Sequence, residues 1–238
     1  MKHFIAFGHS HIVAVAEAYY ERNPGPQGAK FVWLHDEALD PKVVEQDGKT
    51  ILGPAIREKI ETSGAEFVLM VAGGNEHNLI GLSDYPAAFD FVLPERPDLP
   101  VDESCQVMPA ALLYATMARR LAGPLSLLSA MSRESEVPVI QIEPPPPIPD
   151  EEWIGHILAE KGESTAVRAR PVRYKLWRLQ SMLYRTVCAE NGVVFLPCPA
   201  EAVDADGLLS REAWGNDATH ANPWYGGLVL DQIERATT

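Results

Sequence analysis

The sequence predicts an α/β protein, a three-layer α/β/α sandwich built on a five-stranded parallel sheet. Short apolar runs alternate with segments of helical periodicity, which is the pattern of βαβ units. The run 67–71 is apolar throughout, as in a strand that helices cover on both faces. The chain has 238 residues, 46% of them hydrophobic, and shows neither an internal repeat nor a linker. We therefore expect residues 1–238 to form a single domain.

Five apolar runs are expected to be strands, and five amphipathic segments are expected to be helices. The strands are predicted at residues 3–7, 31–34, 67–71, 137–142 and 193–196. The helices are predicted at residues 12–20, 54–62, 109–121, 173–190 and 224–233. Two segments, near 79–106 and 148–170, fit neither pattern and are expected to be insertions. Such insertions are either lids and binding loops or plain surface decoration.

Charge and composition restrict the partners and the location. Lys and Arg number 20 against 33 Asp and Glu, a formal net charge of −13. A surface this acidic repels phosphate backbones and anionic lipids, so we expect neither nucleic acid nor a membrane as partner. The N-terminal apolar run is too short for a signal peptide, and no run of about eighteen apolar residues follows it. Three cysteines without disulfide or metal-ligand spacing (Cys105, Cys188 and Cys198) fit a reducing cytoplasm.

The most polar segments of the chain follow predicted strands. Ligands of open parallel sheets lie beyond the carboxyl ends of the strands. Gly8-His9-Ser10-His11 follows the first strand, and Gly73-Gly74-Asn75-Glu76-His77 follows the third. The loop after the last strand runs to Asp217-Ala218-Thr219-His220. We therefore expect these three segments to meet at one edge of the sheet.

The side chains in these segments suit acyl transfer. Ser10 lies where a strand turns into a helix, and the N–H groups of a helix N-terminus favour developing negative charge. A serine hydroxyl needs a base to become a nucleophile, and His220 is the candidate base. Asp217 could hold the His220 tautomer and stabilise the imidazolium. The Asn75 amide and the Ser10 backbone N–H are candidate donors for an oxyanion hole.

Together these segments resemble the sequence blocks of the SGNH/GDSL hydrolases. Gly8-His9-Ser10 resembles the GDS-type motif after the first strand of that family. Gly73-Gly74-Asn75-Glu76 resembles the GxND-type motif, and the segment 217–220 resembles the C-terminal DxxH motif. The resemblance spans residues 3–236 and implies a flavodoxin-like SGNH fold. It also implies a serine esterase or acylhydrolase that needs no cofactor and forms an acyl-enzyme on Ser10.

The resemblance also implies further site residues. The family has one more oxyanion-hole glycine, which Gly48 resembles best and Gly53 less well. Two positions depart from the family: His9 replaces the usual Asp before the serine, and Glu76 replaces the usual Asp after the asparagine. We expect His9, Glu76 and His77 to line the substrate pocket. The implied substrate is a small-molecule or glycan ester, such as a small O-acyl or acetyl ester on a carbohydrate.

Three alternatives stay open at the level of sequence. An acyltransferase would use the same residues with a second alcohol in place of water. A metal-dependent hydrolase could use the His9-x-His11 pair, since histidine with carboxylate suits zinc. A domain of the same shape could also bind glycans or a partner protein without turnover. The sequence indicates no oligomeric state.

Overall fold

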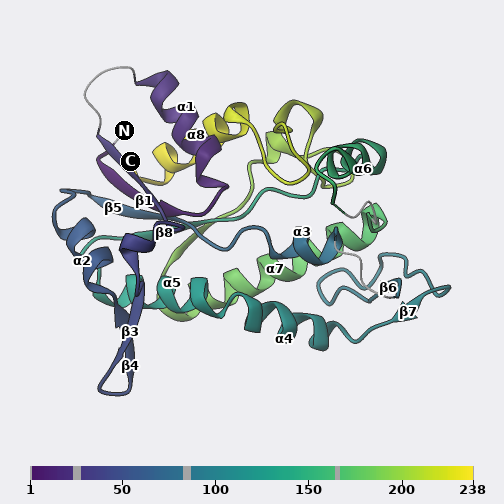
Figure 1. Cartoon of the computed structure of the whole chain (residues 1–238), viewed down its shortest axis with the longest axis horizontal. Coiled ribbons are helices and arrows are strands. Elements are labelled where there is room, and N and C mark those ends of the chain that lie inside the picture. The colour runs from purple at the N-terminus through teal and green to yellow at the C-terminus, as the bar shows by residue number, and fades with distance from the viewer. Residues whose placement is uncertain (1, 24–27, 83–86, 164–166, 238) are drawn as a thin grey trace.

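The computed structural model describes residues 2–23, 28–82, 87–163 and 167–237. Its centre is a five-stranded sheet in which all neighbouring strands are parallel, in the order β2-β1-β5-β8-β9 (Figure 1). The strands are β1 (Phe4–Gly8), β2 (Ala29–Trp33), β5 (Phe67–Val71), β8 (Val139–Ile142) and β9 (Val194–Leu196). The predicted fold class and all five predicted strands are confirmed.

This strand order places a topological switch between β1 and β5. The chain runs outward from β1 to β2 and then returns to the other side of β1 to form β5. Gly8 at the end of β1 pairs with Trp33 on one side and with Val71 on the other. Ligand sites of open α/β sheets lie at such a point, outside the carboxyl ends of the strands.

Helices cover both faces of the sheet, as the alternation of buried side chains requires. On one face Phe4 and Ala6 pack with α1 (Ile12–Arg22), α6 (Glu151–Glu160) and α8 (Pro223–Thr237). On the other face Ile5 and Phe7 pack with a second set of helices. This set contains α2 (Pro54–Glu61), α4 (Ala110–Arg120), α5 (Ala122–Glu134) and α7 (Arg170–Asn191). All five predicted helices are therefore present.

The packing of α8 on α1 determines where the C-terminal loop lies. A Cβ on Gly226 would lie 1.9 Å from the carbonyl oxygen of Ala14, so only glycine allows these helices to approach so closely. Arg22 at the other end of α1 pairs with Asp231, at 2.5 Å. These pairs show that the two helices run in the same direction, with their N-termini together (Figure 1). The loop that precedes α8 is thereby held beside the end of β1.

Several elements were not predicted from the sequence. They are the hairpin of β3 (Val43–Gln46) and β4 (Lys49–Leu52), α3 (Glu76–Gly81), α5, α6 and three short 3₁₀ segments, at Glu37–Leu39, Ala200–Ala202 and Arg211–Ala213. Gly123-Pro124 at the start of α5 reads as a helix stop, but Pro124 lies in the first helical turn, where its missing N–H costs nothing.

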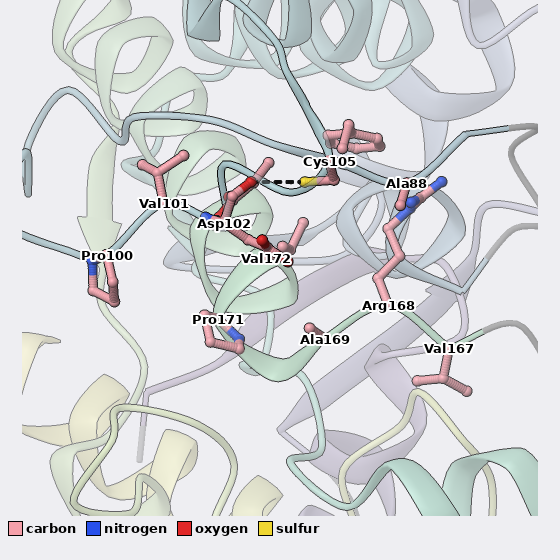
Figure 2. A pocket seen from close by; sticks show the side chains of 12 residues that line it. Ala88, Pro100, Val101, Asp102, Cys105, Val167, Arg168, Ala169, Pro171 and Val172 are labelled. Atoms are coloured by element: carbon pink, nitrogen blue, oxygen red, sulfur yellow. Dashed lines mark hydrogen bonds between the residues drawn. The ribbon is translucent and has the colours of Figure 1, made fainter.

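The described parts of the two predicted insertions lie against each other. Residues 87–107 contain β6 (Phe89–Asp90) and β7 (Gln106–Val107), while α6 occupies much of the second insertion. Residues 83–86 and 164–166 lie outside the described residues. A cavity of about 570 Å³ separates 88–105 from 167–172, and Figure 2 shows the Cys105 thiol within it, bonded to the carbonyl oxygen of Asp102. The side chains that line this cavity include no residue of the predicted catalytic set.

Candidate active site

Three segments meet at the carboxyl edge of the sheet. Ser10 lies between β1 and α1, and Asn75 lies between β5 and α3. Asp217 and His220 lie in the loop before α8, which the α1–α8 packing brings to the same edge. Residues 210 positions apart in the sequence are therefore hydrogen-bonding neighbours.

The structure forms a continuous hydrogen-bonded chain from carboxylate to hydroxyl. The Nε2 atom of His220 lies 2.6 Å from Oγ of Ser10. On the other side of the ring, Nδ1 lies 2.7 Å from Oδ2 of Asp217 and 2.9 Å from Oδ1. The side chains of Asp217 and His220 are each about one-third exposed, at 31% and 27%, so solvent reaches the pair. This is the nucleophile, base and orienting acid arrangement of a serine hydrolase.

The surroundings of Asp217 keep it ionised. Burial alone would raise the pKa of its carboxyl group, but hydrogen bonds from the His220 ring and from the Thr219 and His220 backbone N–H groups outweigh burial. The net result is a pKa well below the usual range. An ionised Asp217 accepts a hydrogen bond from the Nδ1–H of His220. Nε2 is then the unprotonated nitrogen that can accept the Ser10 hydroxyl proton.

The oxyanion side of the site lies at the N-terminus of α1. Ser10 precedes α1, whose first two backbone N–H groups, those of Ile12 and Val13, are bonded to the carbonyl oxygens of His9 and Ser10 at 3.0 and 3.2 Å. Asn75 is the N-cap residue of α3, yet its side chain makes no capping hydrogen bond. Its Oδ1 atom instead accepts a hydrogen bond from Nδ2 of Asn78, at 2.9 Å.

The glycine prediction is wrong. Gly48 lies at the exposed tip of the β3–β4 hairpin, which projects away from the sheet (Figure 1). Gly48 adopts φ +72° and follows Asp47 at φ +52°, so a glycine at this position is explained by the hairpin turn. The backbone N–H of Gly53 is bonded to the carbonyl oxygen of Lys42, at 2.8 Å, so Gly53 has no free donor either.

The three predicted substrate-binding residues lie at different depths. His9 is half-buried, and its Nδ1 accepts the backbone N–H of Gly73, at 3.1 Å. Burial, then the charges of His35 and Lys42, lower the pKa of His9 to about 4. The Glu76 carboxylate binds Arg120 of α4. His77 is 1% exposed, so the prediction that it lines the pocket is wrong.

Sequence reasoning treated His11 only as a possible metal ligand. Its ring is buried and packs on the His220 ring, with 4.7 Å between the ring centroids. Neither ring nitrogen of His11 makes a hydrogen bond of ordinary geometry, although the Asn75 side chain lies beside the ring. Burial, then the charges of His220 and His77, lower its pKa to about 3. No sequence signal gives the depth of this side chain, since it depends on packing against the C-terminal loop.

The donor geometry does not suit the metal alternative. The His9 ring is turned toward Gly73 and His35, whereas the His11 ring is turned toward His220 and Gly74. In the described part of the chain, no three His, Cys, Asp or Glu side chains are grouped so that they could hold a metal ion. His9 and His11, the pair that resembled a metal motif, therefore face different residues and do not converge on one point.

No family model and no curated protein matches the chain, whereas solved structures do. One is a proposed platelet activating factor from Streptococcus pneumonia, at 12% identity and TM-score 0.53, with 99% of this chain and 83% of that one covered. Another is a proposed acylhydrolase from Bacteroides fragilis, at 11% identity and TM-score 0.50, covering 99% and 86%. A G-D-S-L family lipolytic protein from Desulfitobacterium hafniense, likewise proposed, aligns at 8% identity and TM-score 0.46, covering 99% of both chains.

The strand order and the first two of these structures agree with the fold that the resemblance in the sequence implies. The chain has the SGNH hydrolase fold. At such low identities the similarity concerns the fold alone, so the chemistry has to be argued from the side chains. In the SGNH fold of this chain, the site lies at the β1/β5 switch point. Over residues 2–23, 28–82, 87–163 and 167–237, no helix has the length and apolar character to cross a bilayer.

Proposed function

We propose that this chain hydrolyses carboxylic esters through an acyl-enzyme on Ser10. The observation that carries the proposal is the unbroken hydrogen-bonded chain from Asp217 through His220 to Ser10. Solved neighbours that include a proposed acylhydrolase agree with ester chemistry for this fold. A domain that only binds a ligand has no need of a base held 2.6 Å from a hydroxyl.

In the first step Nε2 of His220 takes the proton from Ser10 as Oγ attacks the ester carbonyl carbon. The carbonyl oxygen becomes an oxyanion, and the Ser10 N–H and the Asn75 amide are the proposed donors to it. Asp217 stabilises the His220 imidazolium during this step. His220 then gives its proton to the leaving alcohol as the C–O bond breaks, which leaves the acyl group on Ser10.

In the second step water enters where the alcohol left. His220 takes a proton from this water, whose oxygen attacks the acyl carbon, and a second tetrahedral oxyanion forms in the same site. Collapse returns the proton to Ser10 and releases the carboxylic acid. Only side chains and backbone N–H groups act in either step.

The identity of the substrate is proposed from the family resemblance. We propose a small O-acyl ester, with an acetyl group on a carbohydrate as the first candidate. His9, half-buried beside Ser10, is proposed to contact the substrate next to the scissile bond. The cytoplasmic location and the lack of nucleic-acid and membrane partners stay predictions from composition.

Covalent labelling tests the nucleophile directly. We expect a fluorophosphonate to modify Ser10, located by mass spectrometry of the labelled peptide, and p-nitrophenyl acetate to be hydrolysed. Ser10→Ala should abolish labelling and lower kcat by about 10⁴-fold or more. Ser104→Ala removes an exposed hydroxyl in the first insertion and should change neither result. Labelling elsewhere, or full activity in Ser10→Ala, would overturn the proposal.

A further inference from the structure

Asn78 is a buried amide directly behind the proposed oxyanion donor. It is 3% exposed and lies in the first turn of α3, three residues after Asn75. Its Nδ2 atom donates to Oδ1 of Asn75, at 2.9 Å. An asparagine side chain has an accepting end and a donating end, and only the donating end can stabilise an oxyanion.

The Asn75 side chain does not cap α3. An N-cap asparagine normally accepts a hydrogen bond from a backbone N–H in the first helical turn. In α3 that bond is absent, because Oδ1 of Asn75 is bonded to the Asn78 side chain. The capping bond that Asn75 would have made comes from another helix.

Gln180 of α7 supplies this missing cap. Its Oε1 accepts the backbone N–H of His77, at 2.8 Å, and its Nε2 donates to the carbonyl oxygen of Gly73, at 3.2 Å. Gln180 is fully buried, so both of its ends are used inside the protein. The His77 N–H, a first-turn donor that an N-cap side chain could bind, is therefore satisfied without the Asn75 side chain.

We infer that Asn78 is a positioning residue that fixes the oxyanion donor by holding Oδ1 of Asn75. With its oxygen held by Asn78, the Asn75 amide has its Nδ2 end directed away from Asn78, and this is the end that could donate to an oxyanion. The inference rests on the proposed function, since it assigns a role in stabilising that same oxyanion. It concerns how the amide is oriented before substrate arrives, which is where electrostatic preorganisation acts.

Two substitutions at Asn78 separate orientation from packing. Asn78→Asp preserves the shape but replaces the donor with oxygen, so the new side chain repels Oδ1 of Asn75 and favours a reversed amide. We expect kcat to fall toward the loss of about 10²–10³-fold that removal of an oxyanion donor causes, with KM nearly constant. Asn78→Ala removes the donor without repulsion and should lose less activity. A tetrahedral boronic acid inhibitor should weaken in the same order.

A double-substitution cycle shows whether Asn78 acts through Asn75. In an Asn75→Ala background the effect of Asn78→Asp on kcat should vanish, because the amide to be oriented is gone. A merely structural role would keep its effect in that background and would follow the melting temperature.

The outcomes distinguish the inference from the proposed function. Fluorophosphonate labelling of the wild-type protein at Ser10 comes first. If Ser10 is labelled and Asn78→Asp, folded by circular dichroism, retains the wild-type kcat, the inference fails and the proposed function stands. If Asn78→Asp does not fold, Asn78→Ala in the same cycle decides the matter. If wild-type Ser10 is not labelled and no ester is hydrolysed, both fail together.

Discussion

The site has an outer part (the rim: Ser10, Asp217 and His220) and a buried layer beneath it (His11 and His77). Both contain histidines, but the histidine rings differ in hydrogen bonding and in exposure to solvent. At the rim, His220 is hydrogen-bonded through both ring nitrogens, to Asp217 and to Ser10. Beneath it, His11 and His77 are buried, and each has at least one ring nitrogen without a partner. The rings of His220 and His11 are nevertheless in contact, with centroids 4.7 Å apart.

The difference indicates that exposure to solvent and a carboxylate partner, more than position within the site, make His220 the proposed base. Burial disfavours a charged imidazole, and it lowers the pKa of both His11 and His77 to about 3. His220 has a carboxylate partner and partial access to water, so its protonated form can be stabilised when it takes the Ser10 proton. Three predictions test this contrast between the rim and the layer beneath it.

The largest effect is expected when the rim loses its carboxylate. Asp217→Asn should lower kcat by about 10⁴-fold, because the amide neither stabilises the imidazolium nor holds the required tautomer. We would measure p-nitrophenyl acetate hydrolysis and the melting temperature together. Asp150→Asn is the matched control, since Asp150 caps α6 and asparagine caps equally well. Comparable activity in Asp217→Asn would show that the rim does not depend on its carboxylate.

The low pKa of Asp217 also determines how folding stability changes in acid. Its pKa in the folded chain lies below the ordinary value. The stability it contributes is therefore complete above about pH 3.9 and is lost as pH falls through the folded-state pKa. Asp217→Asn should remove this contribution at neutral pH.

The residues of the rim were the ones that the sequence could predict. Parallel strands place polar segments at their carboxyl ends, so Ser10, Asn75 and the 217–220 loop could be expected at one edge before any contact was known. The five strands followed from continuous apolar runs in the same way. Both inferences depend only on the order of apolar runs and polar segments along the chain, which can be read directly from the sequence.

The Gly48 prediction failed for a local reason. Asp47-Gly48 between two apolar-containing segments is the ordinary signal for a two-residue hairpin turn, and the structure has both residues at positive φ. The resemblance at this position rests on a single glycine, and turn chemistry accounts for that glycine by itself. Few sequences other than Asn-Gly or Asp-Gly form such a turn well.

The layer beneath the rim could not be predicted, because depth and partner depend on distant segments. His77 reads as a pocket residue beside Asn75, but its backbone N–H is bonded to Gln180, 103 residues later. Nothing in the sequence indicates that the Asn78 side chain donates to Asn75. The burial of His77 follows from how α7 packs under α3, which no short motif encodes.

A smaller effect is expected when a side chain is added at Gly74, whose backbone lies against the buried His11 ring. A Cβ at this position would lie 2.6 Å from Cδ2 of the buried His11 ring and 3.3 Å from Cβ of Pro144. Gly74→Ala should therefore destabilise the protein by about 1–3 kcal/mol, measured by urea unfolding, and should lower kcat as His11 is pushed toward His220.

Gly155→Ala in α6 is the control for Gly74→Ala. A Cβ there meets nothing within 4 Å, so alanine should stabilise the helix by roughly 0.5–1 kcal/mol. Equal stability changes in the two variants would mean that Gly74 is not needed for space. The contact between the layers would then be loose enough to absorb a methyl group.

The smallest expected effect concerns how stability changes with pH. The pKa of His11 is lowered from 6.5 to about 3 in the folded chain. Between these values the unfolded chain binds a proton that the folded chain does not, so stability falls as pH falls from 6.5. The slope from one such histidine is at most about 1.4 kcal/mol per pH unit. His11→Leu should remove this share, giving a flatter dependence between pH 6 and 4 in urea unfolding.

His156→Leu on the exposed face of α6 is the matched control, since it removes a histidine from the surface and leaves the buried layer intact. His77 keeps its own contribution in both variants, because its pKa is lowered independently, chiefly by burial. An unchanged slope in His11→Leu would mean that His11 takes up a proton in the folded state. A charged His11 ring would then lie against His220, and burial could no longer explain why only His220 is the proposed base.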